Sequence, residues 1–316
     1  MRDGFNRDIN YLRVSVTDKC NLRCRYCMPE DGIEKIDHEG ILTIDEYLKI
    51  GKIFKDLGVK KIRITGGEPL VKKGIIDLVK GYKDMGFEEI AMTTNGVLLG
   101  DMIEDLKKAG LTRVNISLDT LDKDKYAHIT RGGDIEKVFE SIKKCEELGI
   151  KPIKLNSVLI KDFNDNEFKD FVNLTKDKDM DVRFIELMPI GEGRKYKDNY
   201  ISNEVLIKSM PELVPIESKD KSSPATYYKL PDGKGRVGFI NPISCKFCAN
   251  CNRVRLNQKG QLIMCLHSEK YIDLLPTLRE GGDIESIIKG AILDKPESHH
   301  ILEGDYNSNN MNTIGG

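Results

Sequence analysis

The sequence lacks the features that mark exported, membrane and nucleic-acid-binding proteins. Its amino terminus, M-R-D-G-F-N-R-D-I-N, has no apolar core of the kind that a secretory signal needs, and no apolar run approaches the length of a membrane span. The 50 Lys and Arg residues are balanced by 51 Asp and Glu residues, so the net charge of −1 gives no overall field for nucleic acid or an anionic membrane. We therefore expect neither of these as a partner, and any anionic ligand must be held by a local group of cations.

The composition is ordinary for a soluble globular chain. Apolar residues make up 39% and charged residues 32% of the 316 residues, which is enough for one large α/β domain, alone or with a smaller one. Eight cysteines in a chain without an export signal indicate a reducing, cytoplasmic location and metal binding rather than disulfides. Six of the eight fall into two sets, each built around a close cluster, which supports that interpretation.

Short β-branched runs alternate with amphipathic helical patterns between residue 11 and about residue 188. The predicted strands are Leu12–Thr17, Lys61–Thr65, Glu89–Thr94, Arg113–Leu118, Ile153–Leu159 and Val182–Met188. The predicted helices are Ile44–Leu57, Gly74–Met85, Asp101–Ala109, Ile135–Leu148 and Asn166–Asp177. This alternation predicts a parallel sheet with right-handed crossovers. Because six such units are two fewer than a full barrel has, we predict an α/β fold with an open partial (β/α)6 TIM-type barrel.

The pattern changes after residue 188, so we expect the barrel to cover residues 1–188. A helix near Ser202–Met210 and hairpin strands predict a small C-terminal β-containing lobe over residues 189–294, which would close the open side of the barrel. These strands are Thr226–Leu230, Arg236–Ile240, Arg253–Leu256 and Gln261–Cys265. The polar residues 295–316 are expected to form a loosely ordered tail that ends in Gly315-Gly316.

Polar, glycine and sulfur residues stand at or just after the ends of the predicted strands. They include Cys20, the Gly66-Gly67-Glu68-Pro69 stretch, Thr93 to Gly96, Ser117, Asp119, Glu186 and Met188. Each one alone could be ordinary turn chemistry. In parallel barrels the carboxyl ends of the strands form the active-site face, so together they predict one shared cavity.

Three cysteines, Cys20, Cys24 and Cys27, have the spacing C-x3-C-x2-C directly after the first predicted strand. Thiolates this close in one loop converge on a metal centre. A closed zinc site needs four ligands, whereas three thiolates on a cubane iron–sulfur cluster leave one iron with an open position. From the spacing alone, a zinc loop that borrows His38 and a set of ordinary reduced thiols remain as alternatives.

At these residues the chain resembles the radical S-adenosylmethionine (SAM) superfamily, whose signature is this spacing with an aromatic residue, here Tyr26, before the last cysteine. In that superfamily the open iron chelates SAM, and an electron from the cluster cleaves SAM to methionine and a 5′-deoxyadenosyl radical. The G-G-E-P stretch matches the superfamily's motif for the methionine amino group. Two glycines allow close backbone approach there, and Glu68 can accept a hydrogen bond from a cationic amine.

A second set, Cys248, Cys251 and Cys265, has the spacing C-x2-C-x13-C. Cys245 could add a fourth ligand, which would give a zinc site or a ferredoxin-like relay cluster. Against both stand Arg253 and Arg255, which alternate on one face of the next predicted strand and suit a phosphate-bearing ligand. Other cations could join them: Arg13 and Arg63 lie within apolar strands, where pointing into a polar barrel lumen avoids an unpaired buried charge, and Lys154 lies on the fifth strand.

Stretches over nearly the whole chain narrow the resemblance to the GTP 3′,8-cyclase family, the radical SAM enzymes that open molybdenum cofactor biosynthesis. They are L-R-V-S-V-T-D-K-C-N-L-R-C-R-Y-C-M-P, K-K-I-R-I-T-G-G-E-P-L, T-T-N-G, N-I-S-L-D, R-F-I-E-L-M-P, C-x2-C-N-R-V-R-L with Cys265, and Gly315-Gly316. The departures are small: Lys19 stands where arginine is common, Cys245 is extra, and Thr313 takes a position that is often aromatic.

The resemblance implies a reaction and a role for each matching residue. The radical would take hydrogen from the ribose 3′ carbon of GTP, and the ribose radical would attack guanine carbon 8 to give (8S)-3′,8-cyclo-7,8-dihydroguanosine 5′-triphosphate. Two [4Fe–4S] clusters would be held by Cys20, Cys24 and Cys27 and by Cys248, Cys251 and Cys265, the second binding the purine through its open iron. SAM would be bound by Tyr26, Gly67, Ser117 and Met188. GTP would be bound by Arg13, Arg63, Thr93, Lys154, Arg253 and Arg255, with Arg13, Gly315 and Gly316 in catalytic positions.

The same resemblance implies partners and leaves alternatives. An electron donor such as flavodoxin or ferredoxin and a downstream cyclic pyranopterin monophosphate synthase are implied, and a homodimer is left open. The main alternative is another radical SAM enzyme with auxiliary clusters, of a peptide-modifying or sulfatase-maturing type, although that class carries larger C-terminal cysteine arrays. A non-catalytic zinc-binding adaptor is the alternative from a different class, and metal analysis would separate the two.

Overall fold

The computed structural model describes residues 1–33, 37–218, 220–244, 247–299 and 307–315. Eight of its strands run parallel to a neighbour: β1 (Tyr11–Ser15), β2 (Lys61–Thr65), β3 (Glu89–Thr94), β4 (Arg113–Ser117), β5 (Ile153–Leu159), β6 (Met180–Glu186), β9 (Arg236–Ile240) and β10 (Arg253–Leu256). The antiparallel additions are β7 (Val214–Ile216), β8 (Ala225–Lys229), β11 (Gln261–Ile263) and β12 (Ile272–Asp273).

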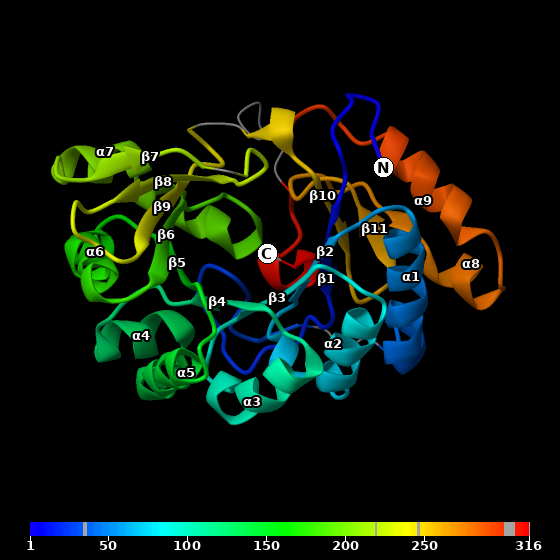
Figure 1. Cartoon of the computed structure of the whole chain (residues 1–316), viewed down its shortest axis with the longest axis horizontal. Coiled ribbons are helices and arrows are strands. Elements are labelled where there is room, and N and C mark those ends of the chain that lie inside the picture. Colours follow the sequence, from blue (N-terminus) through cyan, green and yellow to red (C-terminus); the bar gives the residue numbers. More distant parts are fainter. Residues whose placement is uncertain (34–36, 219, 245–246, 300–306, 316) are drawn as a thin grey trace.

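The helices follow the strands in βα alternation through the first half of the chain. They are α1 (Ile44–Asp56), α2 (Ile75–Asp84), α3 (Leu99–Ala109), α4 (Lys123–Thr130), α5 (Ile135–Glu147), α6 (Phe168–Asp177), α7 (Asn203–Ser209), α8 (Leu275–Arg279), α9 (Ile284–Leu293) and α10 (Met311–Ile314). In Figure 1 the helices α1 to α6 lie around the periphery, whereas the red carboxyl-terminal segment lies in the middle of the molecule.

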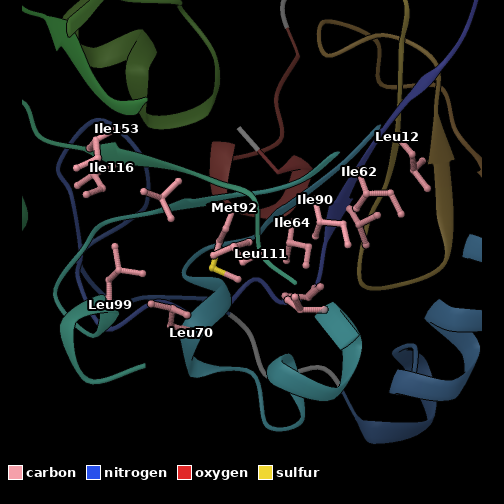
Figure 2. Close-up of a cluster of buried hydrophobic side chains, with 14 of the residues drawn as sticks. Leu12, Ile62, Ile64, Leu70, Ile90, Met92, Leu99, Leu111, Ile116 and Ile153 are labelled. Carbon is pink, nitrogen blue, oxygen red and sulfur yellow. The ribbon is translucent and has the colours of Figure 1, made fainter. Parts of the chain in front are cut away.

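All strands belong to one 12-stranded sheet, in the order β12-β11-β10-β1-β2-β3-β4-β5-β6-β9-β8-β7. Along each central strand the side chains alternate between two environments, as the two-residue period of a strand requires. On β1, Leu12 and Val14 are fully buried in the apolar core, while Tyr11 and Arg13 line a cavity on the other face. Figure 2 shows Leu12 packed with core residues of β2 and β3. The apolar layer between sheet and helices therefore holds the opposite, polar face in place.

The helix ends follow local sequence signals. Thr43 and Glu46 form a capping box at the start of α1, with Glu46 N donating to Thr43 Oγ1 at 3.2 Å and Thr43 N donating to Glu46 Oε2 at 2.8 Å. The glycines predicted to end three helices, Gly86, Gly110 and Gly149, all have the left-handed backbone that favours glycine there.

The open partial barrel predicted from the sequence is confirmed, with every predicted strand and helix present within a few residues of its expected bounds. The hairpins β8–β9 and β10–β11 are confirmed as well. The C-terminal strands do more than cover the barrel, because β9 pairs with β6 and β10 pairs with β1 in parallel register. This pairing gives partners to the backbone groups that β1 and β6 would otherwise leave open at the barrel edges. The expected domain limits at residues 188 and 294 stay a prediction.

The end of the chain differs from the expected loose tail in its described part. Lys295, Asn307 and Ile314 are buried, and Ile314 packs with Ile190 and Ile263. These few contacts leave no periodic pattern in the sequence, so the polar composition of residues 295–316 did not predict them. Residues 300–306 and Gly316 lie outside the described residues. In the described part of the chain, no helix combines the length and apolarity that crossing a membrane would take.

Candidate active site

A cavity of about 640 Å³ lies on the polar face of the sheet and collects residues from both halves of the chain. The predicted site residues that line it are Arg13, Cys20, Cys24, Tyr26, Cys27, Arg63, Gly67, Thr93, Ser117, Lys154, Met188, Cys248, Cys251, Arg253, Arg255 and Cys265. Asp119 lines it too, whereas Glu186 is fully buried beside it and accepts hydrogen bonds from Ser244. The prediction of one shared cavity is thus confirmed for most of these strand-end residues, but not for Glu68, Pro69, Gly96 and Glu186, which do not line it.

The first cysteine set follows β1 in a loop that is tied to the segment after α4. Arg131 donates from Nη1 to the carbonyl oxygens of Arg23 at 2.7 Å and Met28 at 3.2 Å. Burial raises the pKa of the Cys27 thiol to about 12, and burial followed by the charge of Cys27 raises the pKa of Cys24 well above its usual value. Coordination to a metal deprotonates thiols, so the iron of a cluster would offset these raised pKa values.

Tyr26 and Asp119 join the first loop to the end of β4. The Tyr26 hydroxyl donates to Asp119 Oδ2 at 2.7 Å, and the backbone N–H of Val158 donates to Asp119 Oδ1 at 2.8 Å. Burial raises the pKa of Asp119 to about 6, although these two hydrogen bonds oppose the shift. The contact fixes the Tyr26 side chain on the wall of the cavity.

The loop after β2 packs tightly against the residues that precede the first cysteine. A Cβ on Gly67 would collide with the carbonyl oxygens of Lys19 and Asp18, so only glycine fits at this position. The Glu68 carboxylate does not line the cavity: it is fully buried and accepts from Asn95 N at 2.7 Å and Thr94 Oγ1 at 2.8 Å. The side chain that the sequence offered as an acceptor for an amine therefore ties the β2 loop to the β3 loop.

Cations stand in register across the cavity face of the sheet. Arg13 on β1 lies directly between Arg255 on β10 and Arg63 on β2. Burial lowers the pKa of Arg63 to about 10, and burial together with Arg255 and Arg63 lowers the pKa of Arg13 well below its usual value. Guanidinium groups crowded in this way favour binding of an anion, because its charge relieves their mutual repulsion.

Three predicted ligands of the anion have protein partners in this structure. Lys154 Nζ lies 2.5 Å from Asp181 Oδ2, and the same carboxylate pairs with Arg236 at 2.6 Å. Arg253 donates to the carbonyl oxygen of Ser222, in the loop between β7 and β8. Arg255 Nη1 donates to the carbonyl oxygens of Gly315 at 2.5 Å and Ile314 at 3.3 Å.

The end of the chain is seated between the two cysteine loops. Asn312 Nδ2 donates to the carbonyl oxygen of Asp18, just before the first cysteine set, at 3.0 Å. Gly315 has φ +68°, and a Cβ there would lie 2.6 Å from Thr65 Oγ1 and 2.9 Å from Ser15 Cβ. Gly315 does not line the cavity and Gly316 lies outside the described residues, so their expected catalytic position stays a prediction.

The second cysteine set lies among cations. Cys248 and Cys251 precede β10 and Cys265 follows β11, and the described cysteines are all free thiols. Burial raises the pKa of Cys251, yet the charges of Lys295 and Arg253 bring it below its usual value. Cys245, the alternative fourth ligand, lies outside the described residues. Within the described ranges, no three Cys, His, Asp or Glu side chains meet as ligands of one metal ion.

Sequence reasoning missed several cavity residues. They are Tyr11, Lys61, Arg113, Arg183, Tyr227 and Arg236. Arg183 could have been found from its strand, because it alternates with the apolar Val182 and Phe184 of β6, as Arg63 does with Ile62 and Ile64 of β2. Asp181 alternates with apolar residues in the same way, but its partners Lys154 and Arg236 could not be found so, because they follow from the pairing of β6 with β5 and β9.

Comparison with known proteins agrees with this architecture. A family model described as the radical SAM superfamily matches residues 14–175, and one described as Molybdenum Cofactor Synthesis C matches residues 180–301. The Streptococcus suis protein SuiB bound to S-adenosylmethionine superposes with a TM-score of 0.68, covering 91% of this chain and 68% of that one at 15% identity, which supports the fold. The chain belongs to the radical SAM superfamily.

Curated relatives define the family more narrowly. A GTP 3′,8-cyclase of Peptoclostridium acidaminophilum is 53% identical over 317 residues, which cover 99% of this chain and 98% of that protein. One from Clostridium botulinum (strain Langeland) is 55% identical over 305 residues, covering 96% and 95%. Within the superfamily, the chain belongs to the GTP 3′,8-cyclase family.

Proposed function

We propose that this protein is a radical SAM lyase that converts GTP to (8S)-3′,8-cyclo-7,8-dihydroguanosine 5′-triphosphate, the first step of molybdenum cofactor biosynthesis. The observation that carries the proposal is the cavity itself, in which two cysteine sets and a row of cations face one space. Full-length similarity to GTP 3′,8-cyclases supports the choice of GTP and SAM as the molecules that fill it.

The first cysteine set serves the SAM end of the cavity. Membership of the superfamily brings one [4Fe–4S] cluster and SAM, and Cys20, Cys24 and Cys27 would hold this cluster. When bound, it supplies the electron that cleaves SAM to methionine and a 5′-deoxyadenosyl radical. SAM would lie against four residues of neighbouring strand ends, namely Tyr26, Gly67, Ser117 and Met188.

The cations of the cavity would bind the nucleotide. Arg63, Lys154 and Arg253 would grip the triphosphate, exchanging the protein oxygens that Lys154 and Arg253 now contact for phosphate oxygens. Thr93 would position the nucleotide and Arg13, between two other guanidinium groups, would approach the reacting ribose and base. Arg255 would divide its donors between phosphate and the tail. Gly315 and Gly316 would then take their expected catalytic position and exclude water from it.

Further parts of the proposal rest on family resemblance. A second [4Fe–4S] cluster on Cys248, Cys251 and Cys265 would bind the purine. A flavodoxin or ferredoxin would donate electrons, cyclic pyranopterin monophosphate synthase would take the product, and the chain would act in the cytoplasm, where a homodimer is one arrangement.

The test is anaerobic reconstitution followed by product analysis. We expect about eight irons per chain, as two four-iron cubanes require, and SAM-dependent 5′-deoxyadenosine that is coupled to a cyclised nucleotide when GTP is added. A Cys245→Ala variant should keep full iron content. Stoichiometric zinc in place of iron, or 5′-deoxyadenosine without any change in GTP, would overturn the proposal.

A further inference from the structure

Lys295 is a buried lysine next to the second cysteine set. It follows α9, and only 2% of its surface is exposed, which is unusual for a lysine without a strong electrostatic partner. Its ammonium group donates to the carbonyl oxygen of Met264, the residue before Cys265. The fold therefore holds a positive charge at the base of the second cysteine loop.

Arg7 fixes this lysine and the cysteine loop to each other. Its guanidinium donates to the carbonyl oxygen of Cys248 at 3.0 Å and to that of Lys295 at 3.5 Å. Asp3 pairs with the same guanidinium at 2.6 Å, which balances the charge of Arg7. The Asp3 carboxylate thus forms its ion pair with Arg7 rather than with Lys295.

Backbone contacts hold this charge against the second cysteine loop. Met264, which accepts from the ammonium group, directly precedes Cys265, and Arg7 links the carbonyl oxygen of Lys295 to that of Cys248. The ammonium group is therefore fixed beside the segments that carry the second set of thiols.

A fixed positive charge beside a metal cluster changes how readily the cluster takes an electron. Reduction adds one negative charge, and a nearby cation stabilises the reduced state more than the oxidised state. Net charge and burial are among the factors that set the potentials of iron–sulfur clusters.

We infer that Lys295 acts on the second site through its charge, which raises the electron affinity of the cluster on Cys248, Cys251 and Cys265. The inference rests on the proposed function, because it assumes that this cluster exists. It assigns a role to a residue that does not line the cavity, and it makes the second site a better electron acceptor than three thiolates alone would be.

The experiment separates the charge of Lys295 from its hydrogen bond. Lys295→Gln keeps a donor but removes the charge, and Lys295→Arg keeps the charge. As a control, Lys270→Gln removes an exposed charge five residues after Cys265. Each full-length variant is reconstituted anaerobically, its iron is counted, and the potentials of both clusters are measured by electron paramagnetic resonance during a redox titration. Variants without Cys20, Cys24 and Cys27 assign the signal of the second cluster.

We expect Lys295→Gln to weaken electron uptake by the second cluster at least tenfold, which is about 59 mV for a one-electron couple, and to leave the first cluster unchanged. Lys295→Arg and Lys270→Gln should behave like the wild type. An unchanged potential in Lys295→Gln, an equal shift of both clusters, or loss of the second cluster's iron in both Lys295 variants would overturn the inference. Wild-type protein with four irons rather than eight would instead contradict the second cluster of the proposed function.

Discussion

The two cysteine loops each carry three thiols, but different charged groups surround them. Around Cys24 and Cys27 burial and the carboxyl group of Asp119 raise the thiol pKa values. In the second loop burial raises the pKa of Cys265, whereas Lys295 and Arg253 bring that of Cys251 below its usual value. The comparison teaches that cysteine spacing predicts a metal site, while its charge environment depends also on residues distant in sequence, such as Asp119 and Lys295.

Each loop is also held by an arginine from a distant segment. Arg131 binds backbone carbonyl groups of the first loop, and Arg7 binds the carbonyl group of Cys248 and those of Pro296 and Glu297. Guanidinium donors thus add hydrogen bonds to loop carbonyl groups, and that of Cys248 also accepts from Cys251 N at 3.0 Å.

Removing the thiols of one loop at a time is the strongest test of the comparison. Replacing Cys20, Cys24 and Cys27 by Ala should remove about four of eight irons and abolish SAM cleavage, because SAM would lose its iron ligand. Replacing Cys248, Cys251 and Cys265 should remove as many irons but keep SAM cleavage, while the cyclised product disappears. Iron analysis and chromatography of 5′-deoxyadenosine measure both, and identical outcomes for the two triple variants would break the division of labour.

The tail that bridges the two loops gives the next largest effect. Gly315→Ala should lower cyclised product by a hundredfold or more, because the added methyl group meets Thr65 and Ser15 and displaces the tail. Gly149→Ala is the matched control, with the same φ of +68° and nothing within 4 Å of the added Cβ. Backbone strain should lower the free energy of unfolding of both variants by about 1 kcal/mol. A similar loss of product in both would therefore assign the effect to stability alone.

The two arginine contacts should differ in weight. Arg7→Met should lower the free energy of unfolding by roughly 3–5 kcal/mol, because it leaves the buried Asp3 carboxylate without its partner. Arg131→Met should cost less, since its nearest carboxylate, Glu30, is exposed and 3.9 Å away. Denaturant unfolding and iron release should show that each variant loosens its own loop, and release from the opposite loop would contradict this view.

The smallest effect is a pH dependence confined to the first loop. The pKa of Asp119 is about 6 when folded and about 3.8 when unfolded, so the folded state binds more protons between these values. Stability contributed by this group should therefore fall as pH rises, by about 1 kcal/mol between pH 5 and pH 7. Asp119→Asn should remove this part of the slope in anaerobic melting curves, and an unchanged slope would contradict the raised pKa.

Much of the fold follows from local patterns, and particular residues show where those patterns stop. Ile62 and Ile64 alternate with Lys61 and Arg63, which predicts both the strand and its polar face. The helix α9 was not predicted, although its buried residues Ile284, Ile288, Ala291 and Ile292 follow the i, i+4, i+7, i+8 spacing of an amphipathic helix. The site could be located from its cysteines and glycines, because these residue types have few other uses at such spacings.

Partners across the sheet could not be predicted in the same way. Asp181, Lys295 and Arg7 act through strands and loops that meet only after folding, and each reads in the sequence as an ordinary surface charge. The hydrogen bond of Arg255 depends on the position of Gly315, which the polar composition of the tail does not predict. Contacts between residues that lie far apart in the chain cannot be predicted from a single sequence.

The pairing of β1 with β10 has a consequence for folding during synthesis of the protein. Asn252 donates to Asn10 across 242 residues of sequence, so β1, which can pair early with β2, gains its second neighbour only after β10 has been synthesised. At 5–20 residues per second this delay lasts between roughly 10 and 50 s on the ribosome. Until then one edge of the strand that leads into the first cysteine loop has open backbone groups. The sheet is thus completed by joining its first-made strand to one of its last-made strands.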